Sequence, residues 1–182
     1  MPKGLKKTVA LIGMMGAGKT AVGKALAARL SVPFLDSDAE IVKAANMSIA
    51  EIFARDGEAF FRRREREVIA RLLDNERAIL STGGGAFLAE DNRQMIAEKG
   101  VAVWLKADLD ILWNRVKHKN TRPLLRTANP YQTLRDLVAE REPFYQEAGV
   151  IVEAEPDLSI EAMAQKVIEA LRAHGDILED DQ

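Results

Sequence analysis

Short apolar runs alternate along the chain with longer segments in which apolar residues return every three or four positions. The apolar runs hold three to five residues each and lie at 8–12, 32–35, 78–81, 101–105 and 150–152. Runs this short and this apolar are typical of strands that are buried on both faces. The intervening segments have the spacing of amphipathic helices and lie at about 21–30, 39–46, 48–56, 58–74, 89–99, 108–117, 131–147 (broken or kinked at Pro143) and 159–173.

This alternation predicts an α/β fold of three layers, a five-stranded parallel sheet covered by helices on both faces. The chain has 182 residues, which is enough for one full hydrophobic core. We expect a single domain over residues 1–174, followed by a short acidic tail at 175–182 that frays. In such sheets ligands bind beyond the carboxyl ends of the strands, so we look for chemistry there.

The segment between the first strand and the first helix fits the phosphate-binding pattern G-x-x-x-x-G-K-[ST]. It reads Gly13, Met14, Met15, Gly16, Ala17, Gly18, Lys19, Thr20. Glycines let the backbone curl with its N–H groups turned inward, and the start of a helix adds partial positive charge. Lys19 then reaches the β- and γ-phosphates, and the Thr20 hydroxyl holds Mg²⁺. The strand before the loop and the helix after it make a chance match improbable, and we predict a nucleoside triphosphate site of the P-loop type.

Composition narrows the class of protein further. The net charge is −2, so no overall basic field favours nucleic acid as a partner. Because the chain contains no cysteine, it has neither a disulfide framework nor a thiolate metal site. No apolar run approaches the length of a membrane span. We therefore expect a soluble, cytoplasmic protein that binds small molecules, with no membrane or nucleic acid among its partners.

Two carboxylates follow the second strand. Many P-loop proteins take a further Mg²⁺ ligand from an acid at a strand end, and here Asp36 is the candidate, directly or through water. The alternative is that Asp36 only shapes a turn. Asp38 stands at the start of a helix, where it can cap that helix, bind an acceptor hydroxyl and deprotonate it, and these roles do not exclude one another.

Three glycines follow the third strand, at Gly83, Gly84 and Gly85. Three in a row raise the entropic cost of folding, so something must approach that backbone closely, and we interpret the loop as a substrate contact. Arginines near the same edge of the sheet could bind an anionic acceptor with paired hydrogen bonds. The candidate arginines are Arg62, Arg63, Arg64, Arg66, Arg71, Arg122 and Arg141. Composition and spacing do not show which of these arginines would bind the acceptor.

Taken together, these motifs resemble those of the shikimate kinase family over about residues 8–152. Besides the phosphate loop, the matching segments are Phe34-Leu35-Asp36-Ser37-Asp38, Phe61-Arg62-Arg63 with Glu65, Leu80-Ser81-Thr82-Gly83-Gly84-Gly85, Arg122-Pro123-Leu124-Leu125 and Arg141-Glu142-Pro143-Phe144-Tyr145. The resemblance implies transfer of the γ-phosphoryl group of ATP, with Mg²⁺, to the 3-hydroxyl of shikimate. It also implies a substrate-binding subdomain at about 37–65 and a lid at about 117–130.

The resemblance also implies a role for individual residues. Asp38 binds the shikimate hydroxyls, Arg62 and Arg141 hold the carboxylate, and the backbone of Gly84, within the triple glycine, contacts the substrate. The remaining roles fall on the nucleotide side: Lys19 and Arg122 at the transferred phosphate, Thr20 at Mg²⁺ with support from Asp36, and Arg115 near adenine. We expect a monomer.

Two other functions are compatible with a P-loop. One is a nucleotide or gluconate kinase of the same fold, although a nucleotide acceptor would not need two arginines for a carboxylate. The other is a regulator that binds ATP without transferring phosphate. That reading would be favoured if Asp38 or the two arginines were missing, and they are present.

Overall fold

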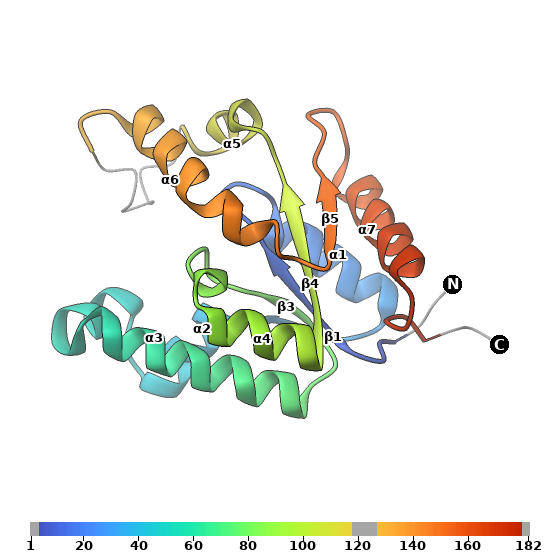
Figure 1. Cartoon of the computed structure of the whole chain (residues 1–182), viewed down its shortest axis with the longest axis horizontal. Helices are drawn as coiled ribbons and strands as arrows, with labels where there is room; N and C mark the ends of the chain where they lie inside the picture. Colours follow the sequence, from blue (N-terminus) through green and yellow to red (C-terminus); the bar gives the residue numbers. More distant parts are fainter. Residues whose placement is uncertain (1–3, 118–126, 180–182) are drawn as a thin grey trace.

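The computed structural model describes residues 4–117 and 127–179, and its centre is a five-stranded sheet. The strands are β1 (Thr8–Ile12), β2 (Phe34–Asp36), β3 (Ile79–Ser81), β4 (Gly100–Lys106) and β5 (Val150–Glu153). They lie in the order β2-β3-β1-β4-β5, and every neighbouring pair is parallel. The predicted five-stranded parallel sheet is therefore confirmed (Figure 1).

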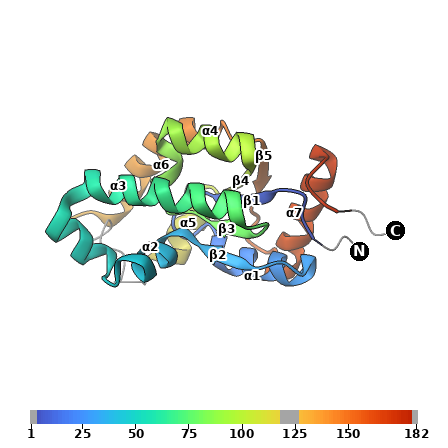
Figure 2. The ribbon, with the colours of Figure 1, turned by 90° about the horizontal axis from the view of Figure 1, so that it is seen from below.

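Helices cover both faces of this sheet. They are α1 (Lys19–Leu30), α2 (Ser37–Ala45), α3 (Ile49–Asn75), α4 (Glu90–Lys99), α5 (Leu109–Val116), α6 (Pro130–Tyr145) and α7 (Ile160–His174), with a 3₁₀ turn, η1 (Ala86–Leu88). Helices α1 and α7 pack together on one face, and α3 and α4 pack together on the other (Figure 2). Among the residues that the structure describes, no helix is both long and apolar enough to cross a membrane.

Two hydrophobic clusters stabilise the molecule. The main cluster surrounds the central strands, where Val9, Leu11 and Val103 are fully buried. The second is smaller and joins α2 and α3 to the sheet through Ile41, Ile52, Phe61, Val68, Leu72 and Leu80. Helices α2 and α3 project from the sheet as an arm with part of its own core, on the left of Figure 1.

Helix α3 combines two of the predicted helices. It begins with the capping box that the sequence indicates, in which Ser48 accepts a hydrogen bond from the amide of Glu51. Gly57 interrupts the helical backbone with φ 85°, so the boundary expected there is a kink within one helix. Helix α6, in contrast, runs through Pro143 to Tyr145, so it is not broken at the proline.

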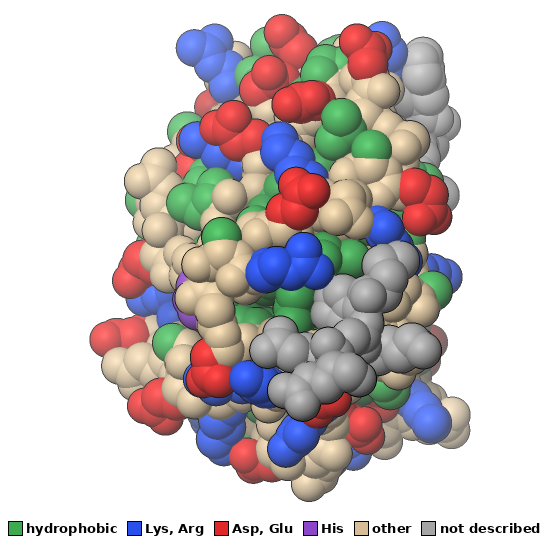
Figure 3. All heavy atoms as spheres, turned by 90° about the vertical axis from the view of Figure 1, so that its right-hand side faces the viewer, with side chains coloured by type: hydrophobic (Ala, Val, Ile, Leu, Met, Phe, Trp, Pro, Cys, Tyr) green, Lys and Arg blue, Asp and Glu red, His purple; other side chains and the backbone are tan. Residues whose placement is uncertain are grey.

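The expectation that the acidic tail frays is wrong for its described part. Ile177 and Leu178 are buried, with exposed fractions of 1% and 7%. Leu178 pairs with Leu5 in an isolated antiparallel bridge, and the amide of Lys6 donates to the carbonyl of Ile177 at 2.7 Å. Two apolar residues within an acidic segment thus seal one end of the core, beside the N-terminus. On the face that carries α7, acidic and basic side chains are intermingled with hydrophobic and other side chains (Figure 3).

Candidate active site

A cleft of about 870 Å³ opens beyond the carboxyl ends of β1, β2 and β3. The phosphate loop, the end of β2, the arm, the triple-glycine loop and α6 all contribute to it. The charged and polar residues that line it are Lys19, Thr20, Asp36, Asp38, Glu58, Arg62, Glu65, Ser81, Thr82 and Arg141, together with Gly83, Gly84 and Gly85. The structure thus brings most of the predicted site residues into one cavity.

The phosphate loop forms because strand β1 ends at Ile12 and α1 begins at Lys19. Gly13, Gly16 and Gly18 all have positive φ, which a side chain would strain. A Cβ on Gly16 would also lie only 2.8 Å from Val116, so α5 closes the back of the loop. The first turn of α1 carries no acid, and Gly18 offers no side-chain cap. The amide groups at the start of α1 therefore remain available to an anion. The Lys19 side chain extends over the loop and donates a hydrogen bond to the carbonyl of Gly13.

Thr20 and Asp36 both line the cleft. In the described residues, no group of three or more Asp, Glu, His or Cys side chains is arranged to hold a metal ion alone. The Thr20 hydroxyl and the Asp36 carboxylate are oxygen donors, which fit Mg²⁺ bound through a few protein oxygens, with phosphates and water completing the shell. One oxygen of Asp36 accepts a hydrogen bond from the amide of Ala39 at 3.1 Å, so Asp36 caps α2.

Asp38 is therefore not the helix cap, because Asp36 fills that position. Its Oδ1 atom is buried and accepts no hydrogen bond from any residue that the structure describes. Burial raises the pKa of Asp38 and the charge of Asp36 raises it further, whereas Lys19 and Arg62 lower it. A buried acceptor oxygen with no protein donor is free to bind the hydroxyl of a ligand.

The triple-glycine loop receives a different charged side chain at each residue. A Cβ on Gly83 would lie 2.9 Å from Asp38 Oδ1, one on Gly84 2.6 Å from Arg141 Nη1, and one on Gly85 2.6 Å from Arg62 Nη2. None of the three has a positive φ. Glycine is needed here for space, because three functional groups approach the backbone from three elements. The close approach predicted from the sequence is confirmed.

Arg62 is held by acids of its own helix. Its Nη1 atom lies 2.9 Å from Glu65 Oε1, and its Nε atom lies 3.8 Å from Glu58. Glu65 is 1% exposed and its Oε2 atom has no hydrogen-bond partner among the described residues. Burial raises the pKa of Glu65, while Arg62 lowers it by charge and hydrogen bond. In the sequence, Glu65 lies on a mostly apolar stripe of its helix. The spacing of three residues between Arg62 and Glu65 is the feature from which this ion pair could have been predicted.

Two aromatic residues line the cleft, and the sequence analysis gave neither of them a role there. Phe53 and Phe61 lie on α3 with ring centroids 4.9 Å apart and form an apolar wall of the cleft. The sequence predicts them on two separate helices, and the kink at Gly57 between them means that helical spacing alone does not bring the two rings together.

The two remaining predicted arginines on the nucleotide side are Arg115 and Arg122. Arg115, on α5, donates from Nη1 to the carbonyl of Gly16 at 2.9 Å, so it contacts the phosphate loop without lining the cleft. Arg122 and most of the expected lid at 117–130 fall outside the described residues.

Comparison with known proteins gives a consistent result. A family model described as shikimate kinase matches residues 15–172. A shikimate kinase of Ruegeria pomeroyi is 67% identical over 175 residues, covering 96% of this chain and 90% of that protein. One of Cereibacter sphaeroides is 63% identical and covers 98% and 89%. A solved shikimate kinase of Acinetobacter baumannii, in complex with shikimate, superimposes with a TM-score of 0.82 at 38% identity, covering 90% of this chain and 91% of that one.

Proposed function

Because the chain belongs to the shikimate kinase family, we propose that its cleft transfers the γ-phosphoryl group of ATP to the 3-hydroxyl of shikimate. The products are ADP and shikimate 3-phosphate. One observation carries this proposal: a buried carboxylate oxygen without a protein donor and two arginines all lie against a single glycine loop, beside a phosphate loop. That set matches an acceptor with both hydroxyl and carboxylate groups.

The nucleotide binds through the amides at the start of α1 and through Lys19. Phosphoryl transfer is accelerated chiefly by positioning and by neutralising charge, which these groups supply without covalent chemistry. Thr20 and Asp36 are the residues that would hold Mg²⁺, and the ion, when bound, neutralises charge on the phosphates. Arg122 is proposed to add positive charge at the transferred group, and Arg115 to lie near the adenine.

Shikimate is oriented at two points. Arg62 and Arg141 grip its carboxylate, and Phe53 and Phe61 offer their apolar wall to its ring. Asp38 accepts a hydrogen bond from the attacking hydroxyl and is placed to take its proton as the new O–P bond forms and the bond to ADP breaks. Glu65 keeps the Arg62 guanidinium at the glycine loop.

We also propose the organisation expected from the sequence. The substrate-binding subdomain is the segment 37–65, which holds α2, the kink at Gly57 and Arg62. The active unit is proposed to be a monomer, as expected from the sequence. The use of ATP by the proposed enzyme supports action in the cytoplasm.

The test is release of ADP from MgATP by the purified protein, with shikimate and with quinate and gluconate as control acceptors. We expect release that depends on shikimate and saturates with it, and little with either control. If ATP bound but no acceptor increased turnover above the hydrolysis background, the proposed function would be wrong and an ATP-binding regulator would take its place.

A further inference from the structure

The chain contains two tyrosines, both on α6, and only one of them adjoins the site. Tyr131 is 38% exposed and packs edge-on against Trp113. Tyr145 is 1% exposed and packs against Trp104 with ring centroids 5.7 Å apart. Its hydroxyl donates a hydrogen bond of 2.7 Å to the carbonyl of Gly84. A buried phenol therefore reaches the middle residue of the triple-glycine loop.

The same hydroxyl also meets Arg141. The two residues are four positions apart and so share a face of α6. Burial raises the pKa of Tyr145, and Arg141 lowers it through its charge and a hydrogen bond to the phenol. Gly84 in turn approaches Arg141 so closely that a Cβ would lie 2.6 Å from Nη1. Tyr145 and Arg141 therefore both adjoin Gly84.

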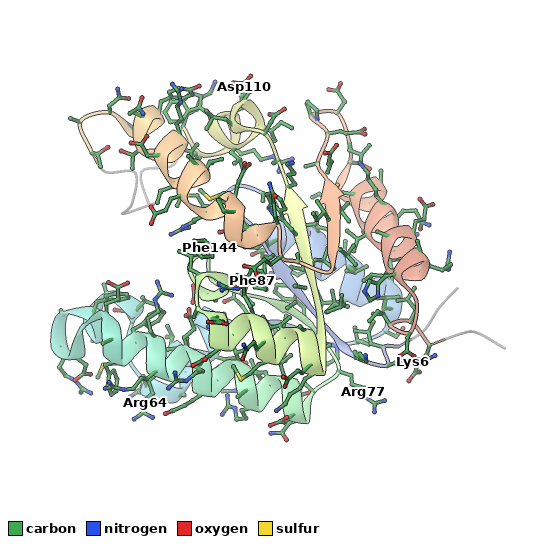
Figure 4. All side chains as sticks on the ribbon, in the orientation of Figure 1. Lys6, Arg64, Arg77, Phe87, Asp110 and Phe144 are labelled. Atoms are coloured by element: carbon green, nitrogen blue, oxygen red, sulfur yellow. The ribbon has the colours of Figure 1, made fainter. Side chains whose placement is uncertain are left out.

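The Tyr145 hydroxyl is not what attaches α6 to this part of the molecule. Arg93 of α4 donates to the carbonyls of Phe87 and Leu88 at 3.0 and 2.9 Å. Its guanidinium also lies 5.2 Å from the ring centre of Phe144. Figure 4 shows Phe144 at the end of α6 close to Phe87 in η1. None of these contacts involves the Tyr145 hydroxyl, so we expect α6 to stay docked when that hydroxyl is removed.

The hydroxyl orients a peptide and a side chain together. The peptide between Gly84 and Gly85 is trans, so its N–H points away from the carbonyl that Tyr145 holds. Both glycines line the cleft, as does Arg141. A single buried group thus sets the angle of the loop amide and the place of the guanidinium beside it.

We propose that Tyr145 is a positioning residue that sets the geometry of the acceptor's carboxylate site, acting through Arg141 and Gly84. The inference rests on the proposed function, because the carboxylate is that of shikimate. It assigns no contact between Tyr145 and the substrate.

The test compares Tyr145→Phe with Tyr131→Phe, a matched loss of the other hydroxyl on the same helix. For Tyr145→Phe we expect the KM for shikimate to rise about five- to tenfold, as for loss of one hydrogen bond, with the KM for MgATP unchanged. Tyr131→Phe should change neither constant. A purely structural tyrosine would instead lower the melting temperature and the active fraction, and neither effect alters KM. A shikimate KM within twofold of wild type in Tyr145→Phe would overturn the proposal.

A double-mutant cycle with Arg141→Ala shows which partner carries the effect. If Tyr145 acts through Arg141, adding Tyr145→Phe to Arg141→Ala raises the shikimate KM by less than twofold more. If the two substitutions raised the shikimate KM by fully additive free energies, Arg141 would be removed from the proposal. Wild-type protein without shikimate-dependent turnover would refute the proposed function itself, whereas an active wild type with an unaffected Tyr145→Phe variant would refute this inference alone.

Fluorine NMR gives a second measurement that does not require the Tyr145→Phe variant to fold. Fluorotyrosine incorporated into the Tyr131→Phe protein labels position 145 alone. Saturating shikimate should shift this resonance, because the groups that touch the phenol then bind a carboxylate. An unchanged resonance would contradict the proposal.

Discussion

Gly85→Ala separates the need for space at the glycine loop from the need for backbone freedom. Gly85 has φ −94° and ψ −6°, which alanine adopts without strain. The added Cβ would lie 2.6 Å from Arg62 Nη2, 3.0 Å from Nη1 and 3.1 Å from Cζ. Only the end of one flexible side chain stands in its way, so the fold should survive and Arg62 should move.

The size of the effect follows from these distances. Ordinary contact begins near 3.4 Å, so Nη2 must retreat by about 0.8 Å. A charged hydrogen bond contributes about 1.5–3 kcal/mol, so misplacing this guanidinium should raise the KM for shikimate by about tenfold or more. The free energy of unfolding should stay within about 1 kcal/mol of wild type. Alanine restricts the unfolded chain, which offsets part of any weakening of the Arg62–Glu65 ion pair.

Steady-state kinetics with each substrate varied, together with denaturant unfolding, test both expectations. Gly175→Ala is the matched control: its φ is 85° and a Cβ would meet nothing within 4 Å. That variant should lose about 1–3 kcal/mol of stability and keep the wild-type KM. A shikimate KM within twofold of wild type in Gly85→Ala would refute the spatial reasoning.

The remaining predictions concern charged groups of the cleft. Lys19→Met should abolish turnover in the ADP-release assay, because the β- and γ-phosphates lose their cation; a near-normal kcat would contradict the P-loop assignment. Arg62→Ala and Arg141→Ala should each raise the shikimate KM about tenfold or more, whereas Arg64→Ala, whose partner is the exposed Glu67, should not. Of the two, Arg62→Ala should also lower the melting temperature more, because it leaves Glu65 buried without its partner. Asp38→Asn should lower kcat by about a hundredfold or more with MgATP binding intact, and wild-type turnover would exclude proton transfer to Asp38. The raised pKa of Asp38 means that the folded state binds its proton more tightly than the unfolded state, so this group's contribution to stability falls as pH rises through the folded pKa. Asp38→Asn should therefore melt higher than wild type at neutral pH, and wild-type kcat/KM should fall on acidification at a higher pH than an ordinary aspartate would produce.

The sequence by itself determined the features that depend on neighbours in the chain. Apolar runs specify buried strands, and the alternation with helical spacing specifies a parallel sheet. The phosphate loop needs glycines at positive φ and a helix start, and both are local properties. The capping box at Ser48 is local as well. The resemblance to a family then singled out Arg62 and Arg141, which spacing alone did not.

Tertiary structure decided what depends on contacts between distant segments. Asp36 rather than Asp38 caps α2, because the exact start of that helix depends on where β2 ends and on the direction of the chain there. The acidic tail is anchored because Leu178 finds Leu5 across nearly the whole chain. Each glycine of 83–85 receives a charged side chain from another element, and Tyr145 reaches Gly84 over 61 positions. Periodicity records which face of an element is apolar; it contains no information on which two faces meet, and this site is formed where they meet.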